Sequence, residues 1–268
     1  MNPQLPGWTI SGDRQSAATR SRNPKVSVVI PALNEAGSLP FVLERIPREV
    51  HEVLLVDGRS SDDTIDIARR NFENICIVMQ PGDGKGDALR AGFAAATGDV
   101  IVALDADGST DPIEIPAFVG ALCAGADFAK GSRFLQGGGT SDMPIHRKLG
   151  NRTFVILVRM LVGGQYSDLC YGYNAFWRDV LPKIDLDGDG FEIEALMNIR
   201  ALKAGLRVVE VASFESRRVK GVAKLRTVPD GWRVLKTIIL DGAGRAGPRG
   251  AEQANKRASV SSEDGRSA

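Results

Sequence analysis

Short apolar runs alternate with longer segments of helical periodicity along the first half of the chain. The apolar runs, rich in β-branched residues, predict five strands at 26–30, 52–57, 75–79, 100–104 and 128–130. Apolar residues spaced three and four apart predict four helices at 38–46, 62–70, 85–96 and 112–123. Strands and helices that alternate in this order are typical of a mainly parallel sheet flanked by helices, so we expect an α/β fold.

The second half of the chain is less regular. Its pattern predicts helices at 147–162, 192–204 and 230–240 and strands at 174–177 and 207–211. The first 24 residues are polar and contain Pro and Gly, and residues 242–268 are rich in Gly, Ser, Ala and mixed charge. We therefore predict a flexible arm at 1–24, one folded domain at 25–241 and a disordered tail at 242–268.

The composition argues against several classes of protein. Hydrophobic residues make up 43% of the chain and charged residues 25%, which is ordinary for a soluble globular protein. The formal net charge of +1 argues against nucleic acid as the main partner. The two histidines and three widely separated cysteines contain no CxxC pair, which argues against a structural zinc site.

The apolar runs are too short for an integral membrane protein. None reaches the ~18–20 residues of a spanning helix, and the amino terminus lacks the apolar segment of a signal peptide. We therefore expect a cytoplasmic protein. Mostly apolar segments with scattered cations, at 154–162 and 232–240, are of the type that lies on a bilayer, in the core or in a dimer interface. Peripheral contact with the cytoplasmic face of the membrane and a homodimer both stay open.

Polar residues gather where the predicted strands end. Asp57 ends the second strand, and Asp105 and Asp107 follow the fully apolar fourth strand, separated by one residue. In a parallel sheet these positions share one edge, where ligands bind. Turn formation is the alternative explanation, and it accounts poorly for the Asp105–Asp107 pair. Two carboxylates with this spacing can share Mg²⁺ or Mn²⁺, with a bound diphosphate as further ligand, and the ion would offset charge on a departing nucleoside diphosphate.

A glycine-rich segment, GDGKG at 82–86, opens the predicted third helix. It does not follow the first strand as a dinucleotide fingerprint would, and Gly86 stands where a P-loop needs Ser or Thr. A helix amino terminus with Lys85 beside it can still face a phosphate. A flexible loop that ends at a helix is an equally good explanation.

The chain as a whole resembles the family 2 glycosyltransferases with the GT-A fold, over about residues 26–226. It is most similar to the dolichyl- and polyprenyl-phosphate mannose synthases and their bacterial relatives. The resemblance rests on the segments VVIPALNE, LLVDGRSSDDT, GKGDALRAGF, GDVIVALDADGSTDP, GSRF, DLCYGYNAFWR and ESRRVKGVAKL. It implies a Rossmann-like nucleotide-binding half. It also implies inverting transfer of a sugar from a donor of the GDP-mannose or UDP-glucose type, with a polyprenyl phosphate as one candidate acceptor.

The resemblance also implies roles for individual residues. It implies that Asp105 and Asp107 hold the metal and the diphosphate, and that Asp57 contacts the base or ribose. The rest of the nucleotide pocket would include Pro31, Leu33, Glu35, Lys85 and Ala106. Phosphate contacts would come from four cations, for which a solvated surface charge is the alternative: Arg133, Arg147, Arg218 and Lys224.

Two positions depart from the family pattern. Gly58 stands where the family commonly has a second aspartate after the second strand, which affects the expected base selectivity. Ser109 stands where the mannose synthases often have Gln, and it is a weaker metal or water ligand.

The nature of the acceptor decides whether the enzyme needs a general base. A hydroxyl acceptor needs one, and Glu192 and Glu194, at a predicted helix start, are candidates, with Glu192 taken as the catalytic residue. Favourable charge at a helix amino terminus explains both residues equally well. A lipid phosphate is already an anion and needs no base.

Two other functions compete with sugar transfer. A sugar nucleotidyltransferase would share the nucleotide pocket and metal carboxylates, but it would carry a glycine-rich loop after the first strand, where this chain has PALNE. A non-catalytic nucleotide-sugar-binding protein has no need to keep both Asp105 and Asp107.

Overall fold

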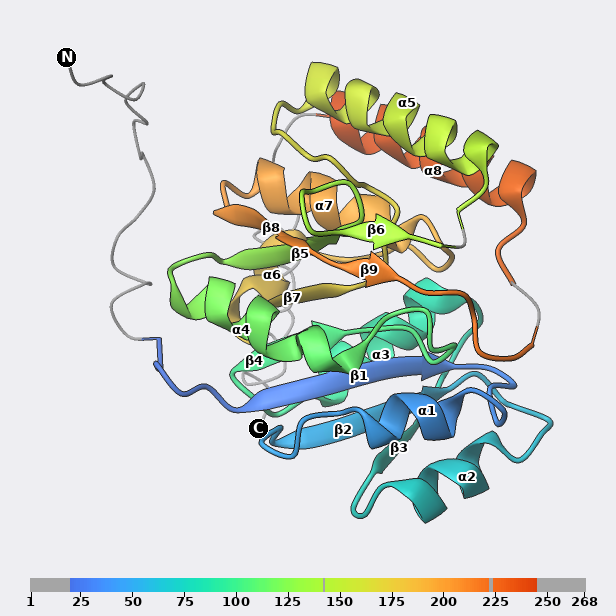
Figure 1. The fold of residues 1–268 in the computed structure, drawn as a ribbon. Coiled ribbons are helices and arrows are strands. Elements are labelled where there is room, and N and C mark those ends of the chain that lie inside the picture. The colour runs from blue at the N-terminus through green and yellow to red at the C-terminus, as the bar shows by residue number, and fades with distance from the viewer. Residues whose placement is uncertain (1–19, 142, 222–223, 245–268) are drawn as a thin grey trace, which may run out of the picture.

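The computed structural model describes residues 20–141, 143–221 and 224–244 (Figure 1). A seven-stranded sheet in the order β3-β2-β1-β4-β7-β5-β8 forms its centre. Its strands are β1 (Val26–Ala32), β2 (Glu52–Asp57), β3 (Cys76–Met79), β4 (Val100–Ala103), β5 (Phe128–Ser132), β7 (Asn174–Trp177) and β8 (Val208–Ala212). Only β7 runs antiparallel to its neighbours β4 and β5, and the other described pairs are parallel. The expected α/β fold with a mainly parallel sheet is thus confirmed.

Helices lie on both faces of this sheet (Figure 1). They are α1 (Leu39–Glu44), α2 (Thr64–Asn71), α3 (Lys85–Ala95), α4 (Ile115–Cys123), α5 (Ile145–Leu161), α6 (Leu181–Ile184), α7 (Ile193–Lys203) and α8 (Thr227–Ala243). Two short 3-10 turns, Pro112–Glu114 and Arg178–Val180, precede α4 and α6. A small second sheet pairs β6 (Gly139–Thr140) with β9 (Phe214–Glu215).

Two apolar clusters hold these elements together. The larger one fills both sides of the central sheet, where every residue of β4 is buried and Phe118 stacks on Tyr173 with ring centroids 4.2 Å apart. The smaller one joins α5, α7 and α8 and consists of Val158, Tyr166, Leu169, Ala195, Ile199, Val234 and Ile238. Figure 1 shows α5 and α8 side by side, running in the same direction, on the far side of α7 from the strands.

The predicted strands are found within two residues, and the helices differ mainly at their ends. The last helix begins at Thr227 and continues to Ala243, past the predicted domain boundary at 241. Most of the predicted arm and tail, residues 1–19 and 245–268, lie outside the described residues. Arg20 belongs to the predicted arm, and its guanidinium forms ion pairs with Asp127 at 2.5 Å and with Asp179 at 2.9 Å. The chain is therefore attached to the domain already at residue 20.

Candidate active site

The loops after β1, β2 and β4 meet at one edge of the sheet because β1 lies between the other two strands. Ala32 at the end of β1 is in register with Asp57 at the end of β2. The amide of Gly58 donates to the Ala32 carbonyl at 2.8 Å, which continues the pairing into the loops. Asp105 and Asp107 follow β4 on the other side of β1. The sheet topology therefore brings the predicted polar residues to one edge.

The carboxylates of Asp105 and Asp107 are each paired with one cation. Asp105 Oδ1 lies 2.5 Å from Lys85 Nζ, and Asp107 Oδ2 lies 2.8 Å from Arg218 Nη2. Asp107 Oδ1 also accepts a hydrogen bond from the amide of Ser109 at 2.9 Å. Burial, followed by the negative charge of Asp105, raises the pKa of Asp107 above its usual value. The two carboxylates thus repel each other and form a site for positive charge.

Lys85 joins this pair to the second half of the chain. Its ammonium group also lies 2.6 Å from Glu194 Oε1, in the first turn of α7. Burial by itself would lower the pKa of Lys85, but the charges of Asp105 and Glu194 outweigh burial and raise the pKa above its usual value. Lys85 therefore stays charged and neutralises two carboxylates.

The glycine-rich segment before Lys85 packs against backbone. The amides of Gly86 and Asp87 both donate to the carbonyl of Asp189, at 2.7 and 3.3 Å. A Cβ atom on Gly84 would lie 2.3 Å from that carbonyl oxygen, and one on Gly86 would lie 2.2 Å from the carbonyl oxygen of Gly188. The glycines thus allow a close approach of two chain segments. The amino end of α3 binds a carbonyl in this structure, which disfavours a phosphate at these amides.

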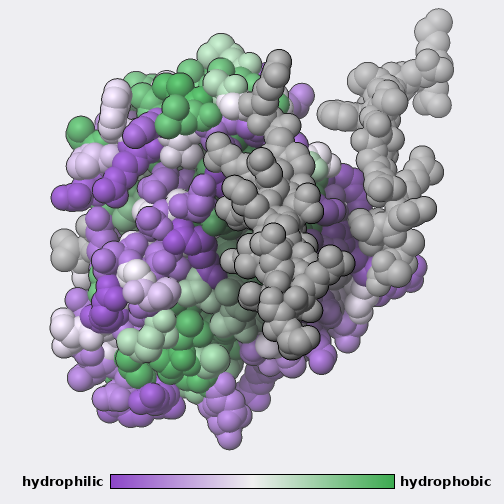
Figure 2. Space-filling model, turned by 180° about the vertical axis from the view of Figure 1, so that it is seen from behind, coloured by the Kyte–Doolittle hydropathy of each residue, from purple (hydrophilic) through white to green (hydrophobic). Residues whose placement is uncertain are grey.

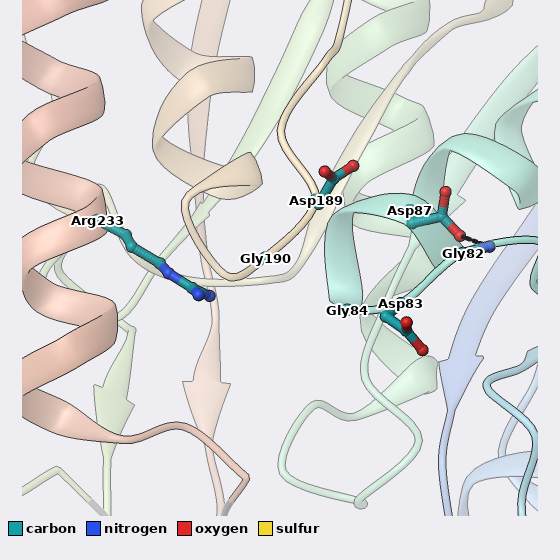
Figure 3. A pocket seen from close by; sticks show the side chains of 7 residues that line it. All are labelled: Gly82, Asp83, Gly84, Asp87, Asp189, Gly190 and Arg233. Carbon is teal, nitrogen blue, oxygen red and sulfur yellow. Dashed lines mark hydrogen bonds between the residues drawn. The ribbon is translucent and has the colours of Figure 1, made fainter.

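A shallow pocket lies outside this contact (Figure 3). Arg233 of α8 reaches toward it from the side opposite α3. Its lining consists of Gly82, Asp83, Gly84, Asp87, Asp189, Gly190 and Arg233. None of the predicted site residues lines it.

Glu35 connects the loop after β1 to a late segment of the chain. Its Oε1 lies 2.9 Å from Arg218 Nη1 and 2.6 Å from Lys224 Nζ. Lys224 also donates to the carbonyl of Leu33. The amide of Val219 donates to the Asp107 carbonyl at 3.0 Å, so the segment that carries Arg218 runs along the Asp105–Asp107 loop. The structure thus gathers residues predicted separately from opposite ends of the sequence.

Asp57 has the environment expected of a ligand-binding carboxylate. It is fully buried, and its Oδ2 accepts a hydrogen bond from the Ser60 amide at 2.9 Å. Its Oδ1 is buried and has no hydrogen-bond partner among the described residues. Leaving a buried acceptor unpaired costs free energy, which a donor group of a ligand would recover. Pro31 lies at the end of the adjacent strand β1, and Ala106, between Asp105 and Asp107 in the sequence, is buried.

The structure does not support the expected phosphate contact of Arg133. The side chain is buried, and it binds Asp168 through Nε at 2.7 Å and Nη2 at 2.9 Å. Its Nη1 lies 2.9 Å from Glu215 Oε1, and the guanidinium stacks over Tyr171, 4.6 Å from the ring centroid. Neither a free phosphate-binding arginine nor a solvated surface charge describes it. Arg133 holds together β9 and the segment before β7.

Arg147 and Glu192 also take no part in the ion pairs around Asp105, Asp107 and Glu35. Arg147, in the first turn of α5, donates from Nε to the Thr227 hydroxyl at 3.4 Å. Glu192 Oε1 accepts from the amide of Gly190 at 2.9 Å, within its own loop. The carboxylate that reaches Lys85 is that of Glu194, so the choice of Glu192 as catalytic residue is not supported. The sequence carries a signal that favours Glu194 over Glu192. Glu194 lies within the mostly apolar stretch Ile193–Met197, and every residue of that stretch is buried.

The carboxylate pair fits a divalent metal shared with a ligand. Within the described ranges, no group of three or more His, Cys, Asp and Glu side chains is arranged to hold an ion unaided. Asp105 and Asp107 supply hard oxygen donors, and they leave positions for phosphate oxygens and water, which is the ligand set that Mg²⁺ and Mn²⁺ prefer. A divalent ion would also relieve the repulsion that raises the pKa of Asp107.

Comparisons with known proteins agree with this arrangement. The model of the family described as glycosyl transferase family 2 matches residues 27–185. Polyprenol monophosphomannose synthase of Mycolicibacterium smegmatis is 34% identical over 235 residues, which cover 82% of this chain and 88% of that protein. An uncharacterized glycosyltransferase of Mycobacterium tuberculosis is 44% identical over 219 residues, which cover 78% of this chain and 97% of that protein.

A solved structure shows the same fold. Glucosyl-3-phosphoglycerate synthase of Mycobacterium tuberculosis, in complex with Mn²⁺, UDP-glucose and phosphoglyceric acid, superposes with a TM-score of 0.67. Its sequence is 23% identical, and the match covers 90% of this chain and 86% of that one. The fold is therefore of the GT-A type. None of the described helices is long and apolar enough to cross a membrane.

Proposed function

Because the chain belongs to glycosyl transferase family 2, we propose that it transfers a hexose from a nucleoside-diphosphate sugar to a polyprenyl phosphate. The observation that carries the proposal is the carboxylate pair Asp105–Asp107, held between Lys85 and Arg218 at the ligand-binding edge of the sheet. The relative from Mycolicibacterium smegmatis, matched over 88% of its length, is named for the synthesis of a polyprenol monophosphomannose. That name supports the acceptor class.

The donor would bind at the edge where Glu35, Asp57, Asp105 and Asp107 converge. Asp105 and Asp107 would hold Mg²⁺ or Mn²⁺, and the bound ion would act as a Lewis acid on the departing diphosphate. Asp57 offers its unpaired buried oxygen to a hydrogen-bond donor of the nucleoside. The structural neighbour from Mycobacterium tuberculosis contains Mn²⁺ and UDP-glucose, which supports donor and metal binding on this fold.

Arg218 and Lys224 would supply positive charge to the phosphates of donor or acceptor. Both side chains contact Glu35 Oε1, so both cations are already held at the site before a ligand binds. The guanidinium of Arg218 can bind a phosphate bidentately, and Lys224 adds a second charge. In-line attack by an acceptor oxygen on the anomeric carbon, with departure of the nucleoside diphosphate, would invert its configuration.

The carboxylates of the site favour an acceptor that is already an anion. A hydroxyl acceptor needs a general base, and a carboxylate that is paired with a cation is a weak one. Glu35 and Glu194 are paired with cations, and Asp105 and Asp107 are assigned to the metal. A phosphate acceptor needs no proton removal, which matches this arrangement.

The proposal is tested by offering the protein matched acceptors. The purified chain is incubated with Mn²⁺, GDP-mannose or UDP-glucose, and either a polyprenyl phosphate or the corresponding polyprenol. We expect glycosyl phosphate product with the phosphate only, its loss with EDTA, and its loss in Asp107→Asn. Product from the polyprenol alone would refute the acceptor class. Pyrophosphate release from a nucleoside triphosphate would instead identify a nucleotidyltransferase, and donor binding without turnover a non-catalytic binding protein.

A further inference from the structure

Lys130, in β5, is a lysine inside the core of the domain. Charged side chains usually lie at the surface, and Figure 2 shows hydrophilic residues over much of one face of the molecule. Lys130 is instead fully buried, and its ammonium group takes part in no ion pair among the described residues. Burial is the largest influence on its pKa and lowers it, against the opposing charges of Asp168 and Glu194. A lysine in this position costs folding free energy, so stability alone does not account for it.

The ammonium group holds the segment that precedes β7. Its Nζ donates to the carbonyl of Tyr171 at 2.6 Å and to the carbonyl of Gly131 at 3.1 Å, and it lies 5.5 Å from the centroid of the Tyr171 ring. Two residues further along, the carbonyl of Tyr173 accepts a hydrogen bond from the Gly131 amide at 2.8 Å. Contacts from β5 therefore fix the backbone on both sides of Gly172.

Gly172 lies against the charged groups of the candidate active site. A Cβ atom on this residue would be 2.8 Å from Asp105 Oδ2, 2.9 Å from Lys85 Nζ and 3.0 Å from Glu194 Oε1. A side chain at this position would therefore have to displace these groups. The backbone of Gly172 forms one wall of the space that holds the Asp105 carboxylate together with its cation.

We propose that Lys130 is a positioning residue for the metal-binding carboxylate of Asp105 and that it acts through the backbone of Gly172. By holding the Tyr171 carbonyl, the ammonium group keeps Gly172 in contact with Lys85 and Asp105. Asp105 then keeps the position from which it can share an ion with Asp107. Replacing a residue that orients a metal ligand without touching the metal commonly lowers metal affinity by about 10–100-fold. The proposal rests on the metal site of the proposed function.

A purely structural role for Lys130 is the alternative. The strands β5 and β7 pair through their backbones, so the sheet itself does not need the ammonium group. The Tyr171 carbonyl does need it, because its other donor among the described residues is the side-chain amide of Asn174, at 3.4 Å. Without Lys130 this buried carbonyl keeps one long hydrogen bond, and the segment that carries Gly172 can move away from the metal site.

Three variants of the full chain test the proposal, together with one control. Lys130→Met removes the ammonium group and keeps most of the side-chain volume, whereas Lys130→Gln keeps an amide donor. Gly172→Ala displaces the charged groups directly, since its methyl group would meet them at 2.8–3.0 Å. The control is Phe128→Leu, at a fully buried residue of the same strand that stacks on Phe176.

Binding of Mn²⁺ and thermal unfolding are measured for each variant. Electron paramagnetic resonance reports the free ion, with and without UDP or GDP, and a titration without protein corrects for binding of the ion to the nucleotide. The unfolding midpoint shows whether the fold is intact. A loss of packing alone would lower the midpoint without a selective effect on the ion, whereas a loss of positioning lowers the affinity for Mn²⁺.

We expect Lys130→Met and Gly172→Ala each to weaken Mn²⁺ binding by about tenfold or more, and Lys130→Gln to lose less. The double variant of Lys130→Met and Gly172→Ala should be little weaker than the worse single variant, because both changes act through the same backbone. Phe128→Leu should lower the unfolding midpoint and leave the Mn²⁺ affinity unchanged.

Unchanged Mn²⁺ affinity in a folded Lys130→Met, or an equal loss in Phe128→Leu, would overturn the proposal. If Lys130→Met does not fold, unchanged affinity in both Lys130→Gln and Gly172→Ala would overturn it. Failure of the unmodified chain to bind Mn²⁺ would overturn this proposal and the metal site together. The expected Mn²⁺ affinities in a chain that transfers no sugar to a polyprenyl phosphate would support this proposal and overturn only the proposed acceptor.

Discussion

The ammonium group of Lys85 lies 2.5 Å from a carboxylate oxygen of Asp105, in the loop that follows β4. The same ammonium contacts Glu194 in α7, so one largely buried cation joins the loop after β4 to the second half of the domain. Its position makes Lys85 part of the charge balance of the site, whereas the sequence left open either a phosphate contact or a flexible loop before a helix.

Replacing Lys85 by methionine should destabilise the domain. The substitution keeps most of the side-chain volume but leaves Asp105 and Glu194 side by side without their cation. Loss of one partner from a buried ion pair costs about 3–5 kcal/mol of folding stability. We expect a value near the lower end, because these side chains are not completely buried. Urea unfolding measures the change. Adding Glu194→Gln to Lys85→Met should recover part of the loss, and a double variant less stable than Lys85→Met would contradict this account of the charges.

Substitutions of the two glutamates before and in α7 should have different effects. With a polyprenyl phosphate acceptor, Glu192→Gln should change kcat/KM by less than about twofold, because this carboxylate contacts only its own loop. Glu194→Gln should lower kcat/KM more, through Lys85, but leave the shape of the pH–rate profile unchanged. A general base would instead show a loss of about 10²–10⁴ and a missing acid limb in the profile, because a base acts only when it is deprotonated. That result for either residue would contradict transfer to an acceptor that needs no base.

Two helical glycines form a matched pair for testing the contact at the start of α3. In Gly86→Ala the new methyl group would meet the Gly188 carbonyl oxygen at 2.2 Å, so the segments must separate. In Gly120→Ala, within α4, no atom lies within 4 Å of the new Cβ. We expect Gly86→Ala to lower stability by about 2 kcal/mol or more. Gly120→Ala should raise stability by ~0.5–1 kcal/mol through helix propensity. Equal thermal shifts in the two variants would contradict the close approach.

The Arg133–Asp168 pair should make stability depend on pH in the acid range. Burial alone would raise the pKa of Asp168, but hydrogen bonds and charge from Arg133 outweigh it and hold the pKa below its usual range. An unfolded aspartate titrates near pH ~4. The ionised pair therefore stabilises the fold fully above about pH 4, and this contribution is lost as pH falls through the folded pKa.

Asp168→Asn is the variant that tests this dependence. At neutral pH it should cost about 3 kcal/mol, because the buried Arg133 loses its two bonds to a carboxylate and keeps only its ion pair with Glu215. Below about pH 4 the difference between the two proteins should shrink, as followed by urea unfolding at several pH values. Asp66→Asn, at an exposed position of α2, serves as control. If the difference in free energy of unfolding between the unmodified chain and Asp168→Asn stayed constant down to pH ~2, the pKa of Asp168 would not be lowered by folding.

The sequence predicted the strands well because buried strands need continuous apolar runs. The run from Val100 to Ala103 is such a case, and the position of Asp105 and Asp107 follows from it. The direction of β7 was not predictable in the same way. Its residues Asn174–Trp177 are buried on both faces, and that pattern is the same for a parallel and an antiparallel strand. Only the pairing with β4 and β5 decides the direction.

Individual side-chain partners were harder to predict than the site itself. Arg133, in GSRF, and Arg218, in SRRVK, were both expected to contact phosphate from the resemblance of their segments. Arg133 finds Asp168 thirty-five positions away and becomes buried, whereas Arg218 finds Glu35 and Asp107 and stays at the site edge. Such pairings depend on tertiary contacts that local spacing does not encode. The choice between Glu192 and Glu194 depended on which side of α7 faces the domain. Two residues along a helix point to opposite sides, so a small error in the helix orientation exchanges the two glutamates.

The bridge between Glu35, Asp107 and Arg218 has a consequence for how the protein is made. Synthesis on the ribosome delivers Glu35 early, Asp107 midway, and Arg218 and Lys224 only near the end of the domain. A nascent chain that has passed residue 107 already carries Glu35, Asp105 and Asp107, yet the two cations that contact Glu35 have not been synthesised. The ion pairs that join Glu35 and Asp107 to Arg218 therefore form only when translation of the domain is almost finished.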